Sequence, residues 1–62
     1  MQKMNDIKKI IDLLEQAKQL ADKTLDQMKP HTRAYLYFDD VRNGLGLEIG
    51  RFKKYLKIME EE

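Results

Sequence analysis

Three features of the sequence contain residue types that could do chemistry: an acidic pair, a lone histidine and a set of glycines. Asp39-Asp40 could bind a divalent cation or form an acid–base pair. On an extended segment, however, neighbouring side chains point to opposite faces, and no third ligand follows at a recognised spacing. We therefore interpret the pair as part of a solvated turn. His31 has no Ser, Cys or carboxylate partner near it in the sequence, which indicates an exposed loop residue rather than a general base.

The glycines at Gly44, Gly46 and Gly50 superficially resemble a phosphate-binding loop. They lack the GxxxxGK[ST] pattern, and the leucines between them are residues that prefer burial. Packing of a β-hairpin explains them better. These features predict no catalytic residue, no metal site and no bound cofactor, so we expect a protein that is not an enzyme.

Tyrosines and basic residues gather in the second half of the chain, and this composition has two interpretations. Tyr and Arg dominate the binding energy of many protein interfaces, whereas aromatic rings beside cations can also hold single-stranded nucleic acid. The sequence pI of about 8.0 is low for a nucleic-acid-binding domain, where values above about 9 are usual. We favour a protein-binding surface, and keep as the alternative a small nucleic-acid-binding regulator that uses the Arg, Lys and Tyr residues of 33–57. The predicted partner-binding residues are Arg33, Tyr35, Tyr37, Arg42 and Arg51.

A long helix over about 5–29 must position the first half of the chain. Asn5 or Asp6 could cap its start, and Lys29-Pro30 supplies a cation and a helix breaker at its end. No Gly or Pro interrupts the residues between them. A second apolar stripe on this helix is expected to be the seam of a homodimer, because a chain of this size without cysteines is marginally stable alone. This dimer stripe consists of Ile10, Leu13, Ala17 and Leu20.

Asn43-Gly44 decides the fold of the second half. Both residues tolerate the positive φ of a tight hairpin turn, and Leu45, Leu47 and Ile49 alternate with other residues as in a half-buried strand. This pattern predicts an α+β fold in one domain, with a long N-terminal helix, a β-hairpin at about 34–50 and a short helix at about 51–61.

An all-α antiparallel helical hairpin is the alternative. Apolar residues recur with a heptad period in both halves, interrupted only by Lys18 and Arg42, and folding at Pro30 would pair Met4 with Met59 and Met28 with Tyr35. Gly44, Gly46 and Gly50 inside one helix would cost about 1 kcal/mol each relative to Ala. On that ground the sequence favours the β-hairpin.

No stretch of the sequence is apolar for the roughly 18 residues of a membrane span, and the N-terminus has no signal-peptide pattern. We therefore expect a cytoplasmic protein with no membrane partner. The size and composition are typical of small inhibitors, adaptors or regulators, including those that bacteria and phages encode. The expected mechanism is steric, by binding to a partner protein.

Overall fold

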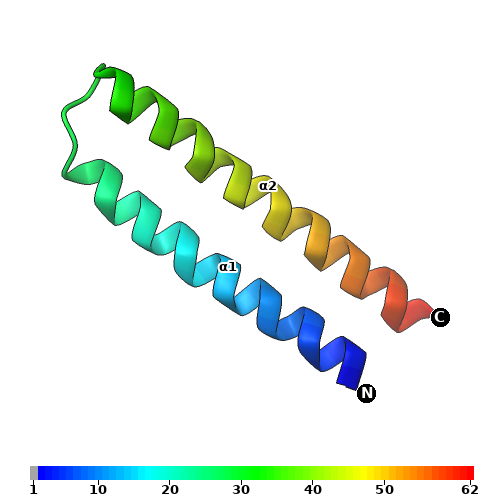
Figure 1. The fold of residues 1–62 in the computed structure, drawn as a ribbon. Coiled ribbons are helices and arrows are strands. Elements are labelled where there is room, and N and C mark those ends of the chain that lie inside the picture. The colour runs from blue at the N-terminus through cyan, green and yellow to red at the C-terminus, as the bar shows by residue number, and fades with distance from the viewer. Residues whose placement is uncertain (1) are drawn as a thin grey trace.

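The computed structural model describes residues 2–62, with side chains from Lys3 onward. It contains two helices, α1 (Gln2–Asp26) and α2 (Arg33–Glu61), joined by residues 27–32. The helices run antiparallel along each other, so that the two ends of the chain lie together at one end of the molecule and the connection lies at the other (Figure 1). The Cα trace measures 46 × 15 × 11 Å along its principal axes. This is the all-α antiparallel helical hairpin.

The predicted α+β fold is therefore wrong, as are the β-hairpin at 34–50 and the separate helix at 51–61. The described residues contain no strand, and α2 continues through Asn43-Gly44 as one helix. No described glycine has a positive φ, so Gly44 does not form the predicted turn. Asp39 and Asp40, interpreted above as part of a solvated turn, lie within α2 instead.

The reason lies in the contact between the helices, which we call the seam. Every seam position is buried or half-buried, including the two polar interruptions. The seam consists of Met4, Ile7, Ile11, Leu14, Lys18, Ala21, Leu25 and Met28 on α1, and of Tyr35, Phe38, Arg42, Leu45, Ile49, Phe52, Leu56 and Met59 on α2.

Burial along this seam outweighs the cost of the helical glycines. That cost is roughly 3 kcal/mol in total, whereas full burial of a single Leu, Ile or Phe side chain is worth about 1.5–3 kcal/mol. The heptad pattern on α2 places several such side chains on one side, and only a continuous helix brings all of them to α1. The most buried residues are Ile11, Ala21 and Leu25 of α1 and Ile49 of α2.

The limits of α1 differ from those predicted at 5–29. Asn5 and Asp6 lie inside the helix rather than at its N-cap. The helix also ends earlier, at Asp26, and the chain then turns through tightened bonds from the Gln27 amide to the Thr24 carbonyl and from the Met28 amide to the Leu25 carbonyl, both 3.1 Å.

Thr32 starts α2 and fixes where the chain reverses. Its hydroxyl accepts a hydrogen bond from the Tyr35 amide at 3.1 Å and donates one to the Lys29 carbonyl at 2.9 Å. This is an N-cap, and it satisfies one of the amides that the first turn of a helix leaves unpaired. His31, just before it, is exposed in the connection as predicted and has a φ of 69°. Histidine is one of the few residue types that adopt this left-handed conformation with some frequency.

Candidate protein-binding surface

The seam separates two sides of the hairpin, and ion pairs mark one of them, which we call the charged flank. Arg42 reaches out of the seam to donate hydrogen bonds to Asp22 of α1 at 2.9 Å and to Asp39 of α2 at 2.6 Å. Farther along the same flank, the Lys53 ammonium lies 3.4 Å from the Glu15 carboxylate. The charged flank consists of Glu15, Asp22, Asp39 and Lys53, with the head group of Arg42.

The Arg42 cluster, which consists of Arg42, Asp22 and Asp39, shifts the pKa values of Asp22 and Arg42. The hydrogen bond from Arg42 lowers the pKa of Asp22 below its ordinary value, against a smaller opposing effect of desolvation, and Lys18 lowers it further. The hydrogen bonds to Asp39 and Asp22 raise the pKa of Arg42. Partly exposed ion pairs of this kind add little stability. Their geometry does tie one level of α1 to one level of α2, so the cluster favours a single register of the helices.

Lys18, the other polar residue of the seam, runs along α2 at Gly46. Its Cε lies 3.5 Å from the place where a Cβ on Gly46 would be, and its ammonium lies 3.5 Å from the Asp22 carboxylate. The apolar stem of Lys18 thus covers the seam while its charge reaches the charged flank, as expected for a snorkelling lysine.

The opposite side, which we call the apolar flank, lacks such pairing between the helices. On α1 it carries the predicted dimer stripe, Ile10, Leu13, Ala17 and Leu20, all of them exposed. On α2 its large side chains are Tyr37, Val41, Tyr55 and Ile58, which are also exposed. Gly44, which is half-buried, lies between Val41 and Tyr55 on the same side. Helical periodicity places the members of each list on one side of their helix.

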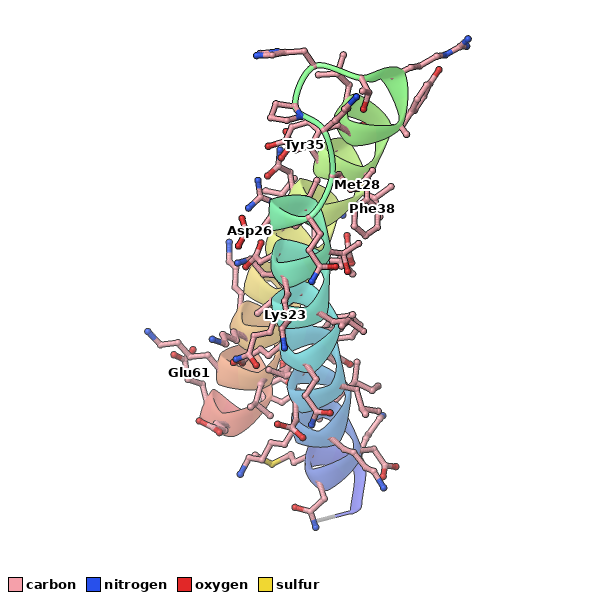
Figure 2. The ribbon with its side chains drawn as sticks, turned by 90° about the vertical axis from the view of Figure 1, so that its left-hand side faces the viewer. Lys23, Asp26, Met28, Tyr35, Phe38 and Glu61 are labelled. Atoms are coloured by element: carbon pink, nitrogen blue, oxygen red, sulfur yellow. The ribbon has the colours of Figure 1, made fainter. Side chains whose placement is uncertain are left out.

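A hollow near the connection shows that the two helices contribute to the same flank. It has a volume of about 440 Å³ and is open to solvent on one side. Met28 and Phe38 lie next to each other on this side of the hairpin in Figure 2. The hollow is lined by Thr24 and Met28 of α1 and by Ala34, Tyr37, Phe38 and Val41 of α2.

The charges on the apolar flank neutralise each other. Glu48 and Arg51 are the charged residues between Ala34 and Ile58 on this side of α2, and they form an ion pair at 3.0 Å. Because these two charges are paired, another apolar surface could pack on the flank without burying an unpaired charge.

The structure does not gather the five predicted partner-binding residues on one surface. Tyr35 and Arg42 are half-buried in the seam, and Arg42 is occupied by Asp22 and Asp39. Arg33 and Tyr37 are exposed near the connection, with the guanidinium 5.7 Å from the ring centroid, a cation–π contact. Arg51 lies farther along the apolar flank.

The predicted partner-binding residues did not include Val41, Tyr55 or Ile58. Val41 was assigned to the β-hairpin, and Tyr55 was counted only in the Arg, Lys and Tyr set of 33–57. The signal that could have found them is the same helical period that marks the dimer stripe on α1. Applied to residues 37–58 as one helix, this period selects Tyr37, Val41, Tyr55 and Ile58 together.

The described residues offer little for other kinds of site. Among them, no three His, Cys, Asp or Glu side chains come together as a metal site would require. Neither of the two described helices is long and apolar enough to cross a membrane.

These observations define the class of the fold as an antiparallel two-helix hairpin with one charged and one apolar flank. No family model, curated protein or solved structure matches the chain.

Proposed function

We propose that this protein is a small, non-enzymatic interaction module that acts by covering its apolar flank with the surface of another protein. The observation that supports this is the row of exposed large apolar side chains on both helices, of which Leu20 is 65% exposed, Tyr37 64% and Val41 57%. Contiguous exposed apolar surface is costly in water, and in soluble proteins it usually marks an interaction site.

The composition of the flank suits this role. Tyr37 and Tyr55 offer large contact area with little loss of side-chain entropy, and aromatic residues often carry most of the binding energy of an interface. The hollow beside Tyr37 is lined by the apolar side chains of Met28, Phe38 and Val41, so it fits one aliphatic or aromatic side chain of a partner.

Within this proposal the protein would work sterically, as an inhibitor, adaptor or regulator that occupies a surface on its target. The homodimer is part of the same proposal, since a second copy is one protein surface that could cover the flank. The bacterial or phage source and the cytoplasmic location stay sequence-based predictions.

The nucleic-acid alternative has less support, because much of its basic set is already paired. Arg42, Arg51 and Lys53 each contact a carboxylate, and Arg33 lies over the Tyr37 ring. Binding to phosphates would have to compete with these contacts. Retention on an oligonucleotide column that falls steeply with added salt would favour this alternative.

The test of the proposed function compares binding by the tagged full chain and its variants. A partner recovered from host lysate is purified, and its affinity for each variant is measured by calorimetry. Tyr37→Ala should weaken binding by about 1–2 kcal/mol or more, as truncation of an aromatic anchor usually does.

Leu47→Ala is the matched control, because Leu47 is similarly exposed, at 71%, and lies on α2 away from the apolar flank. Equal affinities for the wild type and Tyr37→Ala, with a loss on Leu47→Ala, would overturn the proposal.

A further inference from the structure

We propose that the apolar flank is the interface of a symmetric dimer, in which two hairpins pack face to face as a four-helix bundle. This inference rests on the proposed function, because it names a second copy of the chain as the protein that covers the flank. The interface combines the dimer stripe of α1 with the Tyr37 side of α2.

The exposed area is the first argument for a second copy. The hairpin has an accessible surface of 5237 Å², whereas a compact monomer of 7.4 kDa has about 4,200 Å². The excess of about 1,000 Å² is close to the roughly 800 Å² that each partner buries in a stable interface of standard size. Among the described residues, none has a side chain that is completely buried. Pairing along one flank would supply the core that a single hairpin lacks.

The arrangement of side chains is the second argument, because it is nearly symmetric about one level of the hairpin. On α1, Leu13 and Leu20 lie on either side of Ala17. On α2, Val41 and Tyr55 lie equally far along the chain from Glu48. A two-fold interface needs such self-complementarity, since each copy presents the same patch to the other.

Contacts between the helices place Ala17 near the level of Glu48. Lys18 packs at Gly46, and Glu15 pairs with Lys53, so Gln16 and Ala17, which lie between Glu15 and Lys18 on α1, are beside residues 46–53 on α2. A two-fold axis that crosses both helices there would pack α1 on α1 and α2 on α2. Leu13 would meet Leu20 of the second copy, and Val41 would meet Tyr55 of the second copy.

The charges agree with this axis. Arg51 has a side chain that is 79% exposed, and it lies near the level of Glu48. Because Glu48 lies at the axis, the Glu48 side chains of the two copies would meet there, with one Arg51 on either side of them. The two arginines would then offset the repulsion between the two carboxylates.

One consequence concerns the proposed function. A target and a second copy would use the same flank, so they could not bind at the same time. Self-association would then hold the protein in a form that target binding must open, and the apparent affinity for a target would fall as the chain concentration rises.

The experiment combines sedimentation equilibrium with cysteine cross-linking on the full chain. The wild type is expected to be a dimer at micromolar to millimolar concentration. Leu20→Glu should raise the dimer dissociation constant by about 30-fold or more, as loss of an interface anchor does. The matched control is Leu47→Glu, because Leu47 is also exposed, at 71%, and lies on α2 away from the flank. This control should leave the dimer unchanged.

Cross-linking keeps the test decisive if Leu20→Glu fails to fold. The chain has no cysteine, so Ala17→Cys introduces a single thiol at the proposed axis, and mild oxidation should join two chains. Leu47→Cys should stay uncrosslinked. A monomeric wild type, a dimer that Leu20→Glu leaves intact while folded, or absence of the Ala17→Cys cross-link would overturn the inference.

The proposed function fails separately. A monomer that still loses its target on Tyr37→Ala would contradict the dimer alone. A dimer whose target binds elsewhere would contradict the role of the flank in target binding.

Discussion

The two flanks of this hairpin lie on either side of one seam, but they expose opposite kinds of side chain to water. The charged flank joins the helices through Arg42 with Asp22 and through Lys53 with Glu15, and it keeps those side chains solvated. The apolar flank leaves Leu20, Tyr37 and other large side chains in water without such pairing. The charged groups of the charged flank are paired within one chain, whereas the apolar side chains of the apolar flank need another surface to cover them. We therefore place recognition on the apolar flank and register on the charged flank.

The two flanks exist only if the seam holds the helices together, and the largest expected effect lies in the seam. Ile49→Ala should lower the free energy of unfolding by about 2–4 kcal/mol, because it removes a buried side chain and leaves a cavity. Urea unfolding followed by circular dichroism at one protein concentration measures this. Leu47→Ala, at an exposed position, should change stability by no more than about 0.5 kcal/mol. Similar losses for both variants would mean that α2 is not packed on α1 in this orientation.

Two glycines of α2 sharpen the contrast between the apolar flank and the remaining surface. A Cβ on Gly44 or on Gly50 would meet no atom within 4 Å beyond its chain neighbours and the backbone of its own helical turns, and neither residue has a positive φ. Each substitution by Ala should therefore raise the free energy of unfolding by about 1 kcal/mol, through helix propensity. Thermal unfolding of both variants checks this sign. A destabilised Gly50→Ala would contradict the continuous helix.

Gly44 also reports on whether the apolar flank is covered, since it lies on that flank and Gly50 does not. If a second surface approaches closely there, Gly44→Ala should raise the free energy of unfolding less than Gly50→Ala does at high protein concentration. At low protein concentration the two substitutions should raise it by the same amount. Equal gains at every concentration would indicate that nothing packs against Gly44.

On the charged flank, Asp22 should contribute a small part of the acid dependence of stability. Its pKa in the folded chain is lowered from 3.8, so its pairing with Arg42 stabilises the fold above that value and is lost as the pH falls through the lower folded pKa. Asp22→Asn should unfold more easily than the wild type at neutral pH, and the difference should disappear in strong acid.

Asp26→Asn is the control for this effect, because Asp26 is exposed on the outside of α1 (Figure 2). Unfolding midpoints measured from neutral pH to about pH 2 give the comparison. An unchanged acid dependence in Asp22→Asn would show that the Arg42 cluster does not contribute to folding.

The smallest effect is expected at Glu15 and Lys53, whose side chains are largely solvated. Lys53→Glu should cost less than about 1 kcal/mol, and the double variant with Glu15→Lys should recover most of it. The loss should also shrink in 1 M salt, because screening acts on exposed charges. Thermal unfolding of the three variants at low and high salt measures this. A loss that salt does not reduce would assign Lys53 a packing role.

Local signals identified the helices of this chain only in part. The long first helix follows from its uninterrupted helix formers and apolar period. Its start was misplaced because the capping residues Asn5 and Asp6 lie inside it, and its end because the helix stops before the breaker Pro30. Asn43-Gly44 misled the prediction of the second half, since its local preference is for a turn. The mutual burial of Phe38, Ile49 and their seam partners is a long-range gain that such a preference does not contain.

By itself, the sequence determined the two heptad series, their polar interruptions at Lys18 and Arg42, and the existence of an apolar stripe beside the first seam. Only the tertiary structure decided that these series face each other along continuous helices. It also decided that the stripe of Leu13 and Leu20 continues across to Val41 and Tyr55 as one flank. The physical reason is that the helical period determines which residues share a face of one helix. Which face of α1 lies next to which face of α2 depends on how the two helices pack together.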